Sequence, residues 1–136
     1  MFAMANNHRT RNNGTSWLYF EDMAKEYSLE FLQTASSQEA LDWMNEKDNA
    51  LIVCSMPAGS WTDGGHFILI WRVDENNIAY VNDPNSIEDE KTQVPYDSIS
   101  EHCRQYFCFN KTVSSNLTEK YSFLFNNFFI RFKILI

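Results

Sequence analysis

The sequence predicts an α+β fold, a mainly antiparallel sheet with flanking helices, and three observations lead to this prediction. Helical and strand-like segments alternate in the first part of the chain, and several strands then follow one another. Two apolar runs flank the polar turn Asp74–Asn77, which is typical of a β-hairpin. The 136 residues are 44% hydrophobic and 15% aromatic, which is enough for one globular core.

The first half of the chain predicts two helices and two strands. The first helix is expected over 17–27, with Ser16 as its N-cap and an apolar stripe formed by Trp17, Phe20, Ala24 and Tyr27. A short strand follows at 29–32. A second helix begins at Ser36, which forms a capping-box pattern with Glu39. The apolar run Leu51–Met56 predicts a buried strand that ends before a Pro-Ala-Gly loop.

The second half predicts the hairpin, a short helix and a last strand. The first hairpin strand is apolar on both faces, which indicates a central strand covered on both sides. An acidic loop is expected over 85–93, a third helix over 96–103, and a closing strand over 106–109. Residues 110–136 differ in composition, because aromatic residues and asparagine are frequent there and glycine and proline are absent. We therefore expect one domain over 1–109 and a separate aromatic-rich tail over 110–136.

The hairpin brings a histidine and an aspartate to the same end of two neighbouring strands. If Val73 pairs with Ile78, Asp83 lies opposite Ile68, two positions from His66. Side chains alternate between faces along a strand, so His66 and Asp83 then share one face. Such a carboxylate can hold one imidazole nitrogen and leave the other free to accept a proton. The alternative is an ordinary hairpin histidine followed by an Asp-Pro turn.

Composition limits the function classes. The net charge of −7 argues against a nucleic-acid-binding surface, which needs basic patches, and suits a basic protein partner. The three cysteines have irregular spacing, which predicts reduced thiols and neither a disulfide framework nor a zinc pattern. A zinc site made of His66, Asp83 and Cys54 lacks the usual ligand spacing. We therefore expect no metal and no cofactor.

Neither end of the sequence has the pattern of a signal peptide or a membrane-spanning segment. The first residues lack the apolar stretch of a signal peptide, and the last apolar stretch, 121–136, is short and carries Arg131 and Lys133. We expect no transmembrane segment. The chain is expected in the cytoplasm if it is complete, and outside the cell if a signal-bearing segment precedes it.

Four segments together resemble the bacterial C39-like peptidases, which are papain-like cysteine peptidases. In chain order these segments are Gly14–Trp17, Leu51–Met56, Gly65–Leu69 and Val81–Ser86. The resemblance covers roughly residues 1–109 and implies a papain-like half-barrel with an antiparallel sheet. It also implies that His66 is the catalytic histidine and that Asp83 is the acid that orients it.

The same resemblance implies a nucleophilic cysteine upstream of Gly14, at the N-terminus of a helix, with a nearby glutamine. A helix N-terminus favours the thiolate form. No cysteine precedes Cys54, and Gln33 and Gln38 lie in a different segment. We therefore expect a C39-like fold that is truncated at its N-terminus and has no evident nucleophile. Cys54 lies in the middle of an apolar strand, where a buried thiol is usually inert.

Three functions remain open from the sequence. The first is a peptidase-like domain that binds peptide or protein without cutting it, or a fragment of a peptidase, with binding residues Trp61, Gly65, Trp71 and Asn82. The second is a small acidic inhibitor that blocks a basic or nucleic-acid-handling partner, through an acidic loop over 86–93. The third is an active hydrolase that uses an unexpected nucleophile.

Overall fold

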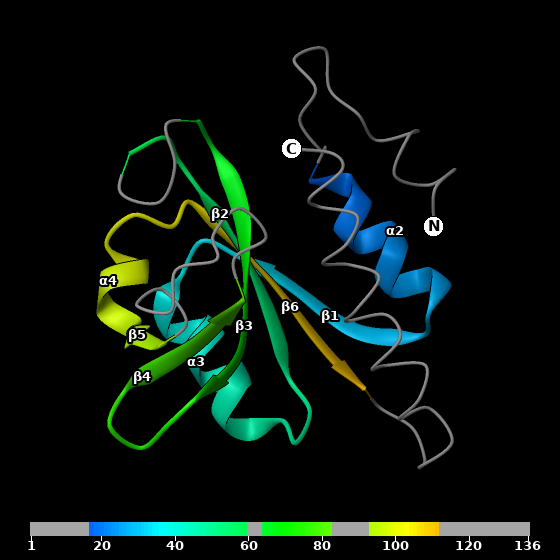
Figure 1. The fold of residues 1–136 in the computed structure, drawn as a ribbon. Helices are drawn as coiled ribbons and strands as arrows, with labels where there is room; N and C mark the ends of the chain where they lie inside the picture. The colour runs from blue at the N-terminus through cyan, green and yellow to red at the C-terminus, as the bar shows by residue number, and fades with distance from the viewer. Residues whose placement is uncertain (1–16, 60–63, 83–92, 112–136) are drawn as a thin grey trace.

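The computed structural model describes residues 17–59, 64–82 and 93–111. Figure 1 shows these segments as one sheet with helices against it. In chain order the elements are α2 (Leu18–Glu26), β1 (Leu29–Thr34), α3 (Ser37–Glu46), β2 (Leu51–Met56), β3 (His66–Val73), β4 (Ile78–Asn82), β5 (Gln93–Pro95), α4 (Tyr96–Ser100) and β6 (Gln105–Lys111). None of the helices in this part of the chain combines the length and the apolarity that a membrane crossing requires.

The described strands form one six-stranded sheet in the order β1-β6-β2-β3-β4-β5, and every neighbouring pair is antiparallel. This confirms the predicted α+β class with an antiparallel sheet. β6 is the predicted last strand, and it lies inside the sheet between β1 and β2. It also continues to Lys111, two residues beyond Phe109, where the sequence analysis ended the first domain. β5 was not predicted, and most of the expected acidic loop lies outside the described residues.

Each face of the sheet carries its own hydrophobic cluster. α2 covers one face, where Phe20 stacks on Phe107 at 4.3 Å between ring centroids and meets Phe67 edge-on at 5.1 Å. We call this the α2 face. The other face packs against α3 and α4, and we call it the α3/α4 face. β3 serves both clusters, since Leu69 points to the first and Ile68 and Ile70 to the second. The prediction that β3 is covered on both sides is confirmed.

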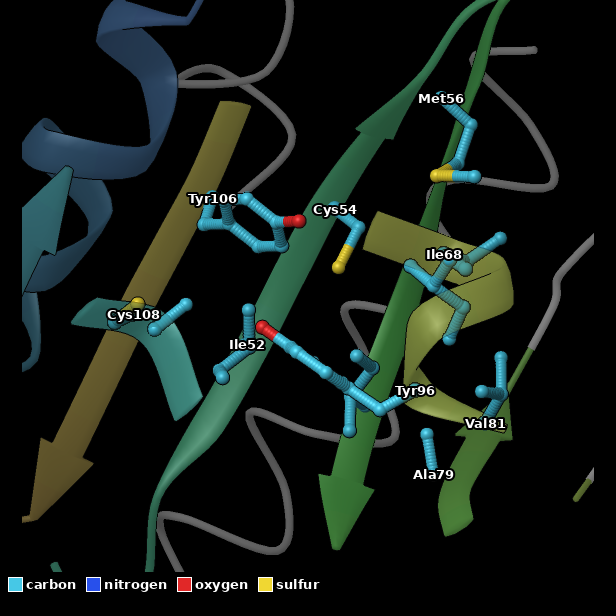
Figure 2. Packing of buried hydrophobic residues seen from close by; sticks show 12 residues of the cluster. Ile52, Cys54, Met56, Ile68, Ala79, Val81, Tyr96, Tyr106 and Cys108 are labelled. Atoms are coloured by element: carbon cyan, nitrogen blue, oxygen red, sulfur yellow. The ribbon is translucent and has the colours of Figure 1, made fainter. Parts of the chain in front are cut away.

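The α3/α4 face is held by side-chain hydrogen bonds to the backbone as well as by apolar contact. Trp43 Nε1 of α3 donates to the Phe109 carbonyl of β6 at 3.1 Å. Tyr96 Oη of α4 donates to the Ser37 carbonyl, at the start of α3, at 2.7 Å. Figure 2 shows Tyr96 reaching in from α4 over the strands, among side chains that include Ile52 and Cys54.

The first helix is shorter than predicted, and its buried stripe is shifted. Phe20 and Ala24 are buried as expected, together with Tyr19 and Met23. The helix begins at Leu18, so Trp17 is its N-cap residue and not part of the buried stripe. Trp17 is 41% exposed. The expected cap Ser16 lies outside the described residues.

The second helix begins as predicted. Ser36 is the N-cap, and its hydroxyl accepts a hydrogen bond from the Glu39 backbone N–H at 3.2 Å. The reciprocal half of the capping box differs, because the Glu39 carboxylate accepts from the Thr34 hydroxyl. The cap therefore links the end of β1 to the first turn of α3.

The hairpin register was wrong at the turn and correct further along. Val73 pairs with Ala79 instead of Ile78 because Asn77 adopts φ 62°, the left-handed position that follows a type I turn in three-residue hairpin loops. The Asp74 carboxylate fixes this loop by accepting hydrogen bonds from the N–H groups of Asn76 and Ile78 at 2.9 and 3.0 Å. A bulge between Ile70 and Arg72 absorbs the extra residue, and the expected register returns from there on.

Phe20 is the centre of the α2 face, so its truncation tests that face. We expect Phe20→Ala to lower the free energy of unfolding by about 3–5 kcal/mol, because it removes a fully buried ring that contacts several others. The matched control is Leu18→Ala on the same helix, where the side chain is 64% exposed and the expected loss is below about 0.5 kcal/mol. Urea unfolding measures both, and equal losses would contradict this packing.

Candidate functional site

His66 is the first residue of β3, and the sheet fixes which way it points. It pairs with Met56, the last residue of β2. Its side chain shares the α3/α4 face with those of Ile68 and Ile70, and only 4% of its surface is exposed. A histidine that is buried where two central strands meet the loops has a restricted orientation.

Gly65, the residue before His66, lies very close to the backbone of β2. A Cβ atom at Gly65 would lie 3.3 Å from the carbonyl oxygen of Met56, and that oxygen belongs to the backbone of a central strand. The neighbouring Gly64 has nothing within 4 Å of its Cβ position. Gly65 therefore allows the chain to approach β2 closely just before His66, and its expected role in binding stays a prediction.

Two of the predicted site residues, Asp83 and Trp61, lie outside the described residues. The last described pair of the hairpin is Leu69 with Asn82. This pair is in the same register as the predicted pairing of Ile68 with Asp83. The pairing of His66 with Asp83 stays a prediction.

The other two predicted binding residues are described, and the structure does not bring them to His66. Asn82 pairs with Leu69, which belongs to the α2 face, whereas His66 belongs to the α3/α4 face. Trp71 lies five residues further along β3, roughly 16 Å away at the usual rise per residue. The bulge leaves Trp71 45% exposed beside Tyr80, at 5.3 Å between ring centroids.

Trp71 instead lines a surface groove of about 350 Å³ at the end of the sheet opposite His66. Lys47, Leu51 and Arg72 contribute to the same groove. Its cations already have partners: Lys47 Nζ lies 3.3 Å from Glu30, and Arg72 lies over the ring of Tyr80.

The three thiols gather on the α3/α4 face or beside it, and two of them are fully buried. Cys54 and Cys108 are each 0% exposed. Burial, together with the interaction with Cys103, raises the pKa of Cys54 well above its ordinary value. Burial also raises the pKa of Cys108, to about 12, with smaller contributions from Cys103 and Glu39. Neither thiol supplies a thiolate near neutral pH, in line with the prediction that Cys54 is a core thiol.

Cys103 differs from the other two thiols in its burial and its ionisation. It follows α4, is partly exposed, and lies 3.2 Å from the Gln105 carbonyl oxygen. The interaction with Cys54 lowers the pKa of Cys103, and the backbones of Gln105 and Ser55 contribute in the same direction, whereas burial acts against them. No sequence signal marks this position, because Cys54 is 49 residues away in the chain.

Comparison with known proteins finds a similar fold among solved structures. No family model matches the chain, and no curated protein matches its sequence. Among solved structures, the fold is similar to that of the peptidase domain of Streptococcus ComA, described as a bi-functional ABC transporter involved in a quorum sensing pathway. The TM-score is 0.56 at 16% identity, over 82% of this chain and 77% of that one. The chain therefore has a C39-like peptidase fold.

The close approach at Gly65 gives a test of how His66 is held. We expect Gly65→Ala to lower the free energy of unfolding by about 1–3 kcal/mol, because the methyl group crowds the Met56 carbonyl and the backbone must give. It should also shift the ¹⁵N signals of the His66 imidazole. Gly64→Ala is the control, and it should do neither. Identical spectra for the two variants would show that Gly65 does not position His66.

The buried thiols predict a loss of stability at alkaline pH. Above about pH 8.5 unfolded cysteines ionise, whereas Cys54 and Cys108 stay protonated in the fold, so the unfolded state releases protons and gains stability. For Cys108 this window extends to about pH 12. Cys103 acts in the opposite sense at lower pH, because its pKa is lowered in the fold and its contribution rises only up to about pH 8.5.

Urea unfolding under reducing conditions between pH 8.5 and 10 measures this effect. The free energy of unfolding should fall by about 1.4 kcal/mol per pH unit for each buried thiol. Cys108→Ala should reduce the slope by one such step. An unchanged slope in this variant would mean that Cys108 is not protected from ionisation.

Proposed function

We propose that this chain is a C39-like cysteine-peptidase-type domain that binds an extended peptide or protein segment at His66 without cleaving it. His66 takes the place of the catalytic histidine, and Asp83 is its orienting acid. The observation that carries the proposal is the placement of His66 at the start of β3, on a fold shared with a peptidase domain.

The strand register supports the role of His66. The described ladder from Ile70–Val81 to Leu69–Asn82 keeps the alignment in which the next residue, Asp83, was expected on the His66 face. A carboxylate there would fix the tautomer of the imidazole and hold the ring in one orientation for peptide binding.

The chemistry of the described thiols supports binding without cleavage. Cys54 is diagonal to His66 across β2 and β3 and shares its face, but it is fully buried and its pKa is raised. Acyl transfer needs a thiolate that substrate can reach. Cys108 is also buried, and its pKa is also raised. The thiol of Cys103 interacts with Cys54 and not with His66.

Titration of the full chain with a pool of extended peptides, followed by ¹H–¹⁵N spectra and mass spectrometry, tests the proposal. Peptides should perturb the signals of Gly65 to Leu69 and remain intact. His66→Ala should weaken binding roughly three- to tenfold, which corresponds to one hydrogen bond. The control is His102→Ala, since His102 is exposed beyond α4 and contacts Glu101 at 4.0 Å.

Other outcomes would favour one of the alternative functions or another binding site. Cleaved peptides would replace this proposal with an active hydrolase. Signals that move only around Trp71 would place the binding site at the opposite groove. A salt-sensitive complex with a basic protein that His66→Ala leaves intact would favour the acidic inhibitor.

The role of Asp83 has its own test. Asp83→Asn should change the ¹⁵N shifts of the His66 imidazole, and unchanged shifts would remove Asp83 from the site.

A further inference from the structure

Two thiols from distant parts of the chain meet at the edge of the α3/α4 face. Cys54 lies in the middle of β2, opposite Tyr106 of β6. Cys103 lies in the turn that joins α4 to β6, and its backbone N–H donates to the Ile99 carbonyl at 2.9 Å. The next residue, Arg104, donates its N–H to the Ser55 carbonyl at 2.9 Å, which fixes this turn against β2. Cys103 packs against the apolar cluster that contains Cys54. The two thiols are close enough to influence each other's ionisation.

The two members of the pair differ in access and in ionisation. Cys54 is 0% exposed, whereas Cys103 is only partly buried. Within the pair, the pKa of Cys103 is lowered and that of Cys54 is raised. Cys103 is therefore the thiol that ionises first and that a small reagent can reach, while Cys54 stays protonated beside it.

We propose that Cys103 and Cys54 form a peroxide-reactive thiol pair that oxidises to an intramolecular disulfide. Cys103 is the thiol that reacts with peroxide, and Cys54 is the thiol that closes the bond. This site is independent of peptide binding at His66.

The chemistry balances with hydrogen peroxide as the oxidant. The Cys103 thiolate attacks one peroxide oxygen; an S–O bond forms, the O–O bond breaks, and hydroxide leaves and takes up a proton to give water. Cys103 is then a sulfenic acid. Cys54 attacks the Cys103 sulfur; the S–S bond forms, the S–O bond breaks, and a second water molecule leaves with the Cys54 proton. Two thiols and one peroxide thus give one disulfide and two water molecules.

Cys108 provides an internal comparison. It lies on β6 opposite Ile52 and Leu32, is 0% exposed, and has its pKa raised to about 12. It should therefore neither react with peroxide nor pair with Cys103. The same chain thus contains one accessible thiol in a pair and one shielded thiol outside it.

The experiment treats the full, reduced chain with hydrogen peroxide at neutral pH, then unfolds it in denaturant with a maleimide that blocks every free thiol, and maps the non-reduced peptides by mass spectrometry. The expected result is a Cys54–Cys103 cross-linked peptide and a single blocked thiol, Cys108. Before oxidation, iodoacetamide should modify Cys103 at least tenfold faster than Cys108. In Cys54→Ala, dimedone should trap the sulfenic acid on Cys103, whereas Cys108→Ala should still form the disulfide.

Specific outcomes overturn the proposal. Three free thiols after peroxide treatment, a bond that involves Cys108, or a disulfide between two molecules would each do so. Because Cys54→Ala disturbs a buried position, the mapping of the unaltered chain decides the matter if that variant does not fold. Equal alkylation rates for Cys103 and Cys108 would also contradict the assigned roles.

Discussion

The fold depends on one constraint, which is that its central strands β6, β2 and β3 project apolar side chains from both faces. Val53, Phe107 and Leu69 point to the α2 face, and other residues of the same strands point to the α3/α4 face. A sheet with two apolar faces must be covered on both sides. α2 covers one face with the Phe20 ring, and α3 and α4 cover the other with apolar contacts and hydrogen bonds to the backbone. His66 and the thiols take their surroundings from this second layer.

Much of this architecture follows from local patterns that the sequence displays. The apolar run Leu51–Met56 became β2 with the predicted bounds, since a β-rich segment before a Pro-Ala-Gly loop has few alternatives. Ser36 became the cap of α3 because its hydroxyl is placed to accept from the N–H of Glu39. Alternation along β3 also placed Ile68 and Leu69 on opposite faces correctly.

What the sequence does not predict depends on contacts between distant residues. β6 follows all the other strands in the chain, so local patterns suggest an edge, yet its side chains are apolar on both faces and it pairs with β1 and β2. Pairing of distant segments cannot be read from periodicity. The bulge at Trp71 is a similar case, because it compensates for the left-handed conformation of Asn77. Trp71 was expected to contact a peptide in a groove beside the hairpin, and it lines a groove at the end of β3 away from His66.

The fold and the chemistry of the site rest on different observations. A TM-score of 0.56 at 16% identity establishes how the strands are arranged, and function must still be argued from the residues that occupy the site. A cysteine peptidase needs an accessible thiolate beside its histidine. Among the described residues, the thiol with a lowered pKa is Cys103, and its thiol neighbour is Cys54, not His66. Cys54 lies two residues before Met56, the strand partner of His66, so the thiol and the imidazole share one face but are only diagonal neighbours. Both proposals made above, peptide binding at His66 and a reaction between Cys103 and Cys54, rest on this separation of the histidine from the thiol with the lowered pKa.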